Sequence, residues 1–210
     1  MINITTLISR IKSKDTILLI IVVLVACLYF VFNIPQASVN ILKTSFDSAI
    51  PRLPIFSVPY LLFIPWLWIV ILYSWYQNRS FRQLAWASII INLIACVVYV
   101  TFQTYIPRDV VMSDDFFSGI LRFIYDHDQA YNGFPSLHSA LSAMVATYFV
   151  CIKSRWSWLF ILIATMIVAS TLFVKQHFIA DAVSGVTLGV LVTWVVFKIH
   201  NKYFRDVCLL

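Results

Sequence analysis

Six apolar stretches divide this chain, and most of them approach the length that a helix needs to cross a membrane. They run over Thr16–Phe32, Phe56–Tyr76, Phe81–Phe102, Leu137–Cys151, Trp156–Val174 and Phe178–Ile199. A spanning helix takes about 20 residues, because the hydrocarbon core of a bilayer is about 30 Å thick. Backbone N–H and C=O groups must pair within each segment there, since no water reaches them. The pattern therefore predicts an all-α polytopic membrane protein, a bundle of six transmembrane helices.

The composition indicates that lipid is the solvent for most of the chain. Of the 210 residues, 61% are hydrophobic and only 11% are charged, whereas a soluble domain holds about 25% charged residues. The net charge of +6 requires no nucleic acid as a partner, because membrane proteins concentrate lysine and arginine in cytoplasmic loops. Without visible repeats, residues 1–210 are expected to form a single transmembrane domain with the bilayer as its partner.

The distribution of lysine and arginine predicts the orientation of the bundle. With a cytoplasmic N-terminus, ten such residues lie in inner segments and five in outer segments. The inner ones are Arg10, Lys12, Lys14, Arg79, Arg82, Lys153, Arg155, Lys198, Lys202 and Arg205, and the outer ones are Lys43, Arg52, Arg108, Arg122 and Lys175. This bias predicts cytoplasmic termini and an extracytoplasmic loop at residues 103–136.

Two outer segments are too long or too polar to be simple connections. Residues 103–136 carry several aspartates, and loops of this length usually have a function. Residues 33–55 are half polar, and Ile41, Phe46 and Ile50 are compatible with a short interfacial helix or with a loop lying on the membrane.

Three consecutive residues of the longer loop, Asp126, His127 and Asp128, have side chains that bind metal ions elsewhere. Three adjacent ligands on a flexible loop are more typical of a solvated surface. We therefore expect a solvated loop here and no metal site.

The first polar cluster lies at the outer end of the fourth apolar stretch, where residues 132–139 read Asn-Gly-Phe-Pro-Ser-Leu-His-Ser. Pro135 and Ser136 are typical of a helix start, because proline fits the first turn and serine caps it. A helix N-terminus offers free N–H groups and a positive dipole end, which together bind anions such as phosphate. His138 lies in that first turn.

The second cluster lies at the outer end of the sixth stretch, where residues 175–181 read Lys-Gln-His-Phe-Ile-Ala-Asp. His177 and Asp181 are four positions apart and share one face if a helix contains both. A carboxylate that accepts a proton from one imidazole nitrogen leaves the other nitrogen free to attack. An interfacial histidine or a structural His–Asp pair explains either cluster alone, but two clusters at one membrane depth favour a single phosphoryl-transfer site.

Gly185 and Gly189 give the sixth stretch a face of small residues. Such faces let two membrane helices approach closely. We therefore expect them to pack the His177 segment against the helix that begins near His138.

These clusters resemble the type 2 phosphatidic acid phosphatase (PAP2) superfamily of six-helix membrane enzymes. Its pattern combines a Lys-x6-Arg-Pro segment, a Pro-Ser-Gly-His segment and a Ser-Arg-x5-His-x3-Asp segment. Residues 135–138 read Pro-Ser-Leu-His, and Ser170, His177 and Asp181 match the third segment with Thr171 at its arginine position.

The first segment of the pattern is matched at Arg108 only, with Thr101 at the lysine position and Asp109 at the proline position. The resemblance extends from about Asp47 to Gly189. The Phe-Pro-Ser-Leu-His and Lys-Gln-His-Phe sequences are most similar to the branch that includes inositol phosphorylceramide synthases and bacterial relatives. This resemblance, with the predicted orientation, implies a protein of the bacterial cytoplasmic (inner) membrane with its site on the outer face.

The resemblance implies a catalytic role for three residues. His177 would attack phosphorus and form a phosphohistidine, and Asp181 would orient it. His138 would protonate the leaving oxygen and then activate water or an acceptor alcohol.

The resemblance also implies how the phosphoryl oxygens are held. Arg108 and the N–H groups near Ser136 and Leu137 would bind them, and Lys175 is the natural substitute for the cations missing at Thr101 and Thr171. Protein cations and helix dipoles can neutralise the charge, so neither a metal nor another cofactor is expected.

Three functions are compatible with these residues. The first is a metal-independent phosphatase that hydrolyses a phosphomonoester or diphosphate of a membrane lipid. The second is a phosphotransferase that moves a phosphorylated head group between lipids, as inositol phosphorylceramide and sphingomyelin synthases do. The third is a transporter or non-catalytic membrane binding protein, which the presence of His138, His177 and Asp181 disfavours.

Overall fold

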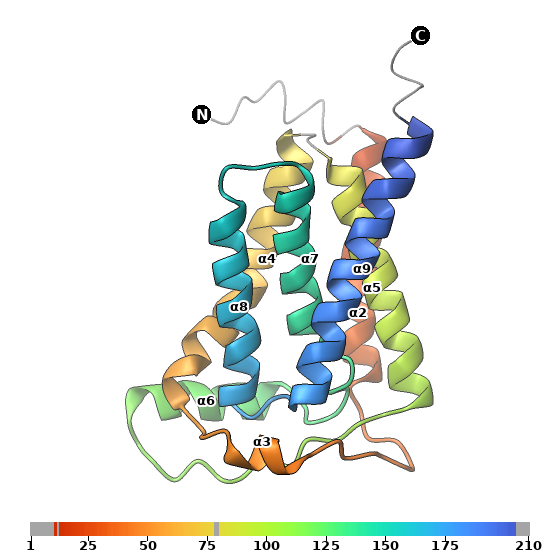
Figure 1. The fold of residues 1–210 in the computed structure, drawn as a ribbon. Helices are drawn as coiled ribbons and strands as arrows, with labels where there is room; N and C mark the ends of the chain where they lie inside the picture. The colour runs from red at the N-terminus through yellow and green to blue at the C-terminus, as the bar shows by residue number, and fades with distance from the viewer. Residues whose placement is uncertain (1–10, 12, 78–79, 205–210) are drawn as a thin grey trace.

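The computed structural model describes residues 11, 13–77 and 80–204, and in these ranges the regular structure is helical, without strands. The helices are α2 (Lys14–Phe32), α3 (Ser45–Ala49), the 3-10 turn η1 (Pro54–Phe56), α4 (Ser57–Gln77), α5 (Phe81–Thr101), α6 (Phe116–His127), α7 (Leu137–Cys151), α8 (Ser157–Phe173) and α9 (Ile179–Phe204) (Figure 1). Arg10, Lys12, Arg79 and Arg205, which contribute to the predicted orientation, lie outside the described residues.

The long helices α2, α4, α5, α7, α8 and α9 run side by side in one bundle (Figure 1). Four segments, Lys14–Phe32, Pro54–Gln77, Phe81–Thr101 and Ile179–His200, are long and apolar enough to cross a membrane. The apolar helices α7 and α8 are shorter, with 15 and 17 residues. The all-helical fold is confirmed, and the lengths of the apolar helices are consistent with an integral membrane protein. The count of six spans and the orientation stay predictions.

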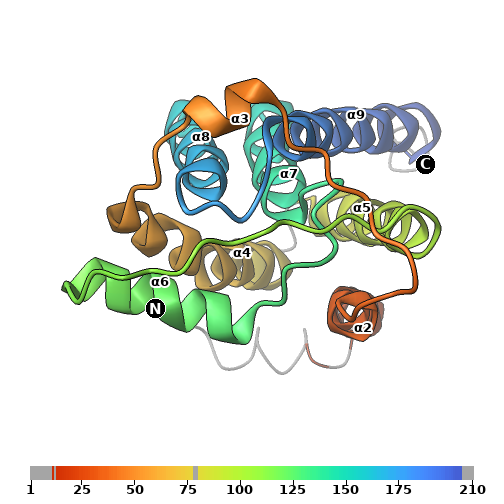
Figure 2. The ribbon, with the colours of Figure 1, turned by 90° about the horizontal axis from the view of Figure 1, so that it is seen from below.

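Helix α7 is the centre of the bundle and contacts α4, α5, α8 and α9, as Figure 2 shows from below. Most of its side chains are buried, and many of them are small: Ser139, Ala140, Ser142, Ala143 and Ala146. Small side chains let neighbouring backbones approach closely, which is how helices associate where lipid removes the hydrophobic driving force. The residues that begin α7 are therefore held from several sides.

The closest packing joins α7 to α9, at the two predicted glycines. A Cβ atom added at Gly185 would lie 2.4 Å from the Ser136 carbonyl oxygen, and one at Gly189 would lie 2.1 Å from the Ala140 carbonyl oxygen. Both distances are too short for a real side chain, and both neighbours are backbone atoms that cannot rotate away. The two glycines thus allow the start of α9 to lie directly against the start of α7, as expected.

Replacing Gly189 by alanine is expected to destabilise the bundle, because the helices must separate to admit the methyl group. Overpacking of this kind costs about 1–3 kcal/mol, and thermal unfolding in detergent measures it as a lower Tm. The matched control is Gly119→Ala in α6, where an added Cβ meets nothing within 4 Å. Alanine is favoured over glycine in helices, so this variant should unfold at the same or a higher temperature. Equal Tm values for the two variants would contradict the packing role.

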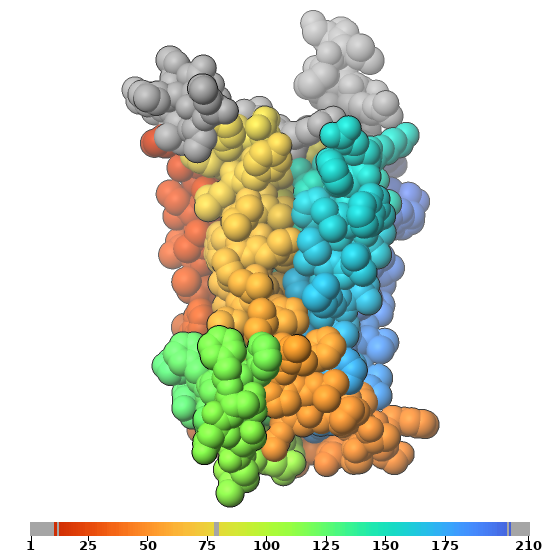
Figure 3. All heavy atoms as spheres, turned by 90° about the vertical axis from the view of Figure 1, so that its left-hand side faces the viewer, coloured from red at the N-terminus to blue at the C-terminus, as the bar shows by residue number. Residues whose placement is uncertain are grey.

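Helices α3 and α6 cover one end of the bundle, as Figures 2 and 3 show. The side chain of Asp115 caps α6 by accepting the N–H groups of Phe117 and Ser118. Leu121 and Ile124 on the inner face of α6 are buried, in a small second core with Tyr60 of α4. The sequence indicated that the loop 103–136 is more than a connection, but α6 itself was not predicted.

The segment 33–55 is mostly irregular and contains one short helix, α3. Thr44 and Asp47 form a capping box at its N-terminus, in which the Thr44 side chain accepts the Asp47 N–H. The segment is thus a loop across the end of the bundle with a helix of five residues within it. Its position at a membrane interface stays a prediction.

Candidate functional site

The two predicted clusters meet at the end of the bundle that α3 and α6 cover. The ring centroids of His138 and His177 are 5.9 Å apart. The Ser136 N–H donates to the Asp181 carbonyl oxygen at 3.1 Å, which ties the start of α7 to the start of α9. The structure therefore brings both histidines and Asp181 into one site, although they lie on different helices.

The start of α7 leaves backbone donors for an anion. Ser136 is the N-cap, and its side chain accepts the Ser139 N–H. Its own N–H is used by Asp181. The first intrahelical bond runs from the Ala140 N–H to the Ser136 carbonyl, so the N–H groups of Leu137 and His138 remain available at the positive end of the helix.

His177 lies just before α9 and does not share the helix with Asp181, which is the third residue of α9. Asp181 Oδ2 accepts the Phe178 N–H at 2.8 Å, so this carboxylate caps the helix. It also lies 3.6 Å from His177 Nδ1. This distance is longer than a hydrogen bond, and such contacts often tighten only when substrate binds. The expected common helical face is thus replaced by a capping turn, and the carboxylate still faces the imidazole.

Burial and backbone bonds hold this turn in place. Asp181 is fully buried and His177 is only 8% exposed. The carbonyl oxygen of Thr171 accepts the N–H groups of both Gln176 and His177. The imidazole therefore has little freedom to turn away from Asp181.

Asp47 of α3 caps α9 from outside. Its Oδ1 accepts the Ile179 N–H at 2.7 Å, and its Oδ2 accepts the Thr44 N–H and hydroxyl at 2.7 and 2.6 Å. Burial favours the neutral carboxyl group, but the hydrogen bonds from Thr44 and Ile179 outweigh it and lower the pKa of Asp47. The charged carboxylate stabilises the positive end of α9.

Lys175 points toward this same α3 segment. Its Nζ donates to the Asp47 carbonyl oxygen at 2.9 Å and to the Ile50 carbonyl oxygen. It also lines a polar cavity of about 310 Å³ together with Lys43, Arg52 and Phe178. The structure thus gives Lys175 a role in holding the α3 segment, and its role in phosphate binding stays a prediction.

Arg108 holds the turn that follows α6. Its guanidinium donates to the carbonyl oxygens of Tyr125, Asp128 and Gln129, at 3.3, 2.5 and 3.0 Å. It also donates to the side-chain oxygen of Gln176, next to His177. The predicted arginine is therefore linked to the histidine site, and most of its N–H groups are already in use.

Three buried donors near these residues lack a partner among the described residues: Arg108 Nε, Asn132 Nδ2 and Gln176 Nε2. Leaving a buried donor unpaired costs about 1–3 kcal/mol, so several of them close to one site suggest a missing acceptor. Phosphoryl oxygens are acceptors of this kind.

The positions where the sequence departs from the family pattern supply no cation. The Thr101 hydroxyl donates to the Val97 carbonyl, and the Thr171 hydroxyl donates to the Val168 carbonyl. Both side chains are thus bonded within their own helices.

Asp128 is the main residue that the sequence analysis misjudged. One carboxylate oxygen accepts from the Tyr29 hydroxyl at 2.9 Å and from Asn33 Nδ2 at 3.1 Å, and the other accepts from the Tyr60 hydroxyl at 2.9 Å. Asp126 and His127 are exposed as expected, but they lie in the last turn of α6 and not in a loop. Asp128 is half-buried and bonded to α4 and the end of α2. The sequence feature that could have indicated this bonding is the presence of two tyrosines, Tyr29 and Tyr60, at the depth of the histidines.

The ring of His138 lies against two rings of α4. Tyr60 stacks on it with centroids 4.3 Å apart and planes at 22°, and Phe63 contacts it at 4.5 Å. Because Tyr60 and Phe63 are one turn apart, they form a continuous aromatic wall.

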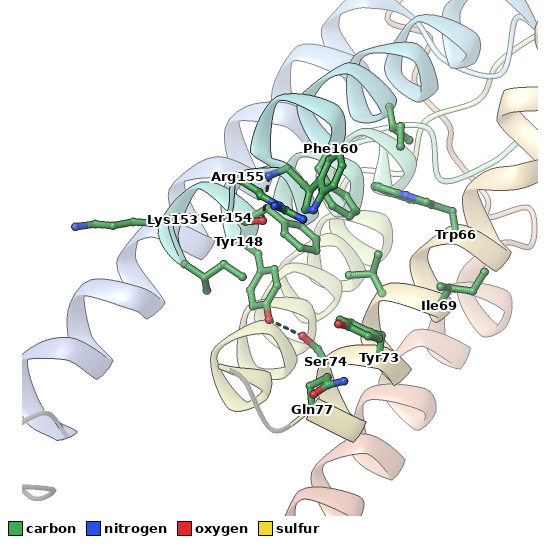
Figure 4. A pocket seen from close by; sticks show the side chains of 15 residues that line it. Trp66, Ile69, Tyr73, Ser74, Gln77, Tyr148, Lys153, Ser154, Arg155 and Phe160 are labelled. Atoms are coloured by element: carbon green, nitrogen blue, oxygen red, sulfur yellow. Dashed lines mark hydrogen bonds between the residues drawn. The ribbon is translucent and has the colours of Figure 1, made fainter. Parts of the chain in front are cut away.

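A large hollow of about 1200 Å³ lies elsewhere, between α4, α7 and α8 (Figure 4). Trp66, Tyr73 and Phe160 line it, and Ser74 and Tyr148 are hydrogen-bonded to each other at 2.5 Å in its wall. Neither His138 nor His177 lines it. The histidine cluster, with its unpaired donors, is therefore the better candidate for a reaction site.

Comparison with known proteins agrees with this choice. The family model described as PAP2 superfamily matches residues 110–205, a range that contains His138, His177 and Asp181. No curated protein and no solved structure matches the chain. At the superfamily level the match supports phosphatase or phosphotransferase activity on lipid phosphates, and the resemblance to the inositol phosphorylceramide synthase branch stays a prediction.

Proposed function

We propose that this chain is a lipid phosphatase that hydrolyses a phosphomonoester or diphosphate of a membrane lipid through a phosphohistidine. The observation that carries the proposal is the pair of histidines from two helices, 5.9 Å apart by ring centroids. The Asp181 carboxylate lies 3.6 Å from His177 Nδ1, and the unpaired donors Arg108 Nε and Gln176 Nε2 lie close by. Nucleophile, orienting carboxylate and proton donor are the three parts that such a transfer requires.

The proposed reaction has two steps. In the first, His177 Nε2 attacks phosphorus, the bond to the lipid oxygen breaks, and protonated His138 gives its proton to that oxygen. In the second, neutral His138 takes a proton from water, which attacks the phosphohistidine and releases phosphate. Asp181 faces Nδ1 of His177, so it holds the N–H tautomer there and stabilises the charge that develops on the ring.

In this proposal the phosphoryl oxygens are bound by protein groups alone. Arg108 Nε and Gln176 Nε2 are buried donors without a partner among the described residues. The N–H groups of Leu137 and His138 add the positive end of α7. Donors fixed before the reaction stabilise the charge that develops on these oxygens. Lys175 is proposed as an additional cation at the edge of the site.

A phosphotransferase is the second candidate, and one observation favours it. The polar cavity of about 310 Å³ is lined by Lys175 and Phe178, the residues that flank the Gln176–His177 pair. In this second candidate the cavity holds the body of the acceptor. Its hydroxyl group extends from there toward His177, which does not itself line the cavity. His177 and His138 would have the same roles in both reactions.

One assay distinguishes the candidates. Purified protein in detergent is incubated with phosphatidic acid, phosphatidylglycerol phosphate or a polyprenyl diphosphate, with and without inositol or a lipid alcohol as acceptor. Released phosphate and new phosphorylated lipids are measured together. Phosphate release without acceptor supports the phosphatase, and product formation that depends on acceptor supports the transferase. If neither product forms with any donor, the proposed function is wrong.

Turnover is expected to persist in excess EDTA, because protein donors and cations bind the phosphoryl oxygens in the proposed site. The comparison is the initial rate before and after dialysis against EDTA, with a rate within about twofold expected. A large loss that a divalent ion restores would contradict this account.

A further inference from the structure

We propose that Asp128 is a positioning residue that holds the proton-transferring His138 in place through Tyr60. This inference rests on the proposed function and adds two residues to its machinery. Neither the PAP2 pattern nor the family match assigns them a role, and Tyr60 lies outside the matched range of residues 110–205.

The first step of the argument is the bonding of the Asp128 carboxylate. Three donors from two segments converge on it: the Tyr29 hydroxyl and Asn33 Nδ2 at the end of α2, and the Tyr60 hydroxyl of α4, at 2.9, 3.1 and 2.9 Å. Bonds to a charged acceptor are roughly twice as strong as neutral ones. Tyr60 is only 5% exposed, so few solvent molecules compete for its hydroxyl. The carboxylate therefore fixes the position of the Tyr60 ring.

The second step is the contact between Tyr60 and His138. The two rings are stacked at 4.3 Å with planes at 22°, and Phe63 supports the imidazole from the same helix. A displaced Tyr60 ring would let the imidazole rotate, and proton transfer depends steeply on distance and direction. Asp128 thus acts on His138 through one intermediate side chain.

The third step is that Asp128 also contacts the phosphate-binding side of the site. Its backbone carbonyl accepts a hydrogen bond from Arg108 at 2.5 Å, while its carboxylate accepts one from Tyr60. One residue therefore joins the arginine proposed to bind phosphate to the wall that holds the proton donor. Asp128 therefore sets the distance between Arg108 and the Tyr60 ring.

Replacing Asp128 by asparagine tests this role. Asparagine has one acceptor oxygen for three donors, and its NH2 group must face at least one of them. The matched control is Asp126→Asn, which removes an exposed carboxylate two positions away. Both variants are compared with the wild-type protein on phosphatidic acid and on a nitrophenyl phosphate that carries an alkyl tail.

The two substrates separate positioning of the proton donor from general damage. The alkoxide leaving from phosphatidic acid needs a proton, whereas nitrophenolate leaves without one. For Asp128→Asn, kcat/KM, which reports the first step alone, is expected to fall about 10–100-fold on phosphatidic acid and by less than about threefold on the nitrophenyl ester. Asp126→Asn should match the wild-type protein on both substrates.

A second variant keeps the test decisive if Asp128→Asn folds poorly. Tyr60→Phe preserves the stacked ring and removes only the hydroxyl, so it should reduce kcat/KM on phosphatidic acid in the same way. If Asp128 acts through Tyr60, the double variant should be no slower than the slower single variant, because the two residues form one connection.

Three outcomes would overturn the proposal. They are an equal loss of kcat/KM on both substrates, independent effects of the two substitutions that multiply in the double variant, and wild-type rates in Tyr60→Phe. If the wild-type protein cleaves neither substrate, the proposed phosphatase function fails as well. If the wild-type protein turns over either substrate and any of the three outcomes is observed, only the proposed role of Asp128 is wrong.

Discussion

Replacing His177 by asparagine is expected to abolish hydrolysis of lipid phosphates, with kcat falling on the order of 10⁴-fold or more. The proposed reaction has no phosphohistidine without this imidazole, and Asp181 has no ring to orient. Water could still attack the bound phosphoryl group directly. Because the groups that bind this phosphoryl group are unchanged, the binding of phosphate should change much less than kcat. Released phosphate measures the loss, and trapping of labelled phosphate on the protein measures the missing intermediate.

The fold of this variant is expected to survive, because the local structure does not depend on the imidazole. The backbone N–H of His177 donates to Thr171, and Asp181 retains the Phe178 N–H as its partner. Asparagine can also donate to the carboxylate. A Tm close to that of the wild-type protein is the control. Turnover that persists in a folded His177→Asn protein would exclude His177 as the nucleophile.

The long helices were predictable because lipid leaves the chain few choices. Each apolar stretch must satisfy its own backbone groups, so hydropathy alone gives their bounds. The stretch Leu137–Cys151 coincides with α7, and the start of Phe81–Phe102 coincides with that of α5. The end of α9 was placed too early, at Ile199 instead of Phe204, because the helix continues into polar residues that hydropathy does not count.

The histidine cluster was predictable from local patterns at two helix starts. Ser136 caps α7 as expected, but Pro135 precedes the cap and does not lie in the first turn. The order of the six apolar stretches placed both clusters on one side. The prediction was wrong about the local structure at the start of α9. His177 is excluded from the helix because Asp181 caps it, and a spacing of four residues does not distinguish a capping turn from a helical face.

The network around Asp128 was not predictable, because it depends on contacts that no local pattern encodes. Asp128 is separated from Tyr29 by 99 positions and from Tyr60 by 68. Lys175 is a similar case, since its bonded partners in the α3 segment lie 128 and 125 positions away. Both side chains are near the expected depth, and only the folded chain determines what they contact.

Replacing Arg108 by glutamine is expected to lower kcat about 10²–10³-fold, the usual loss when one donor to a developing oxyanion is removed. Glutamine cannot reproduce the fork that joins Gln176 to the turn after α6. It also lacks the positive charge that the transferred phosphoryl group requires. Because this charge attracts the bound anion too, inhibition by vanadate or inorganic phosphate should weaken in parallel.

The matched control is Arg122→Gln, because Arg122 also donates to backbone carbonyls on the same end of the bundle, those of Val111 and Ser113. Arg122 also forms an ion pair with Asp114 at 3.5 Å. Its partners among the described residues do not include His138 or Gln176. Loss of structural bonds alone would affect both variants similarly and would appear as a lower Tm. Both variants are therefore expected to have a lower Tm, whereas loss of phosphate binding should appear only in Arg108→Gln, as a higher inhibition constant. Equal inhibition of both variants by vanadate would show that Arg108 stabilises the turn after α6 and does not bind the phosphoryl group.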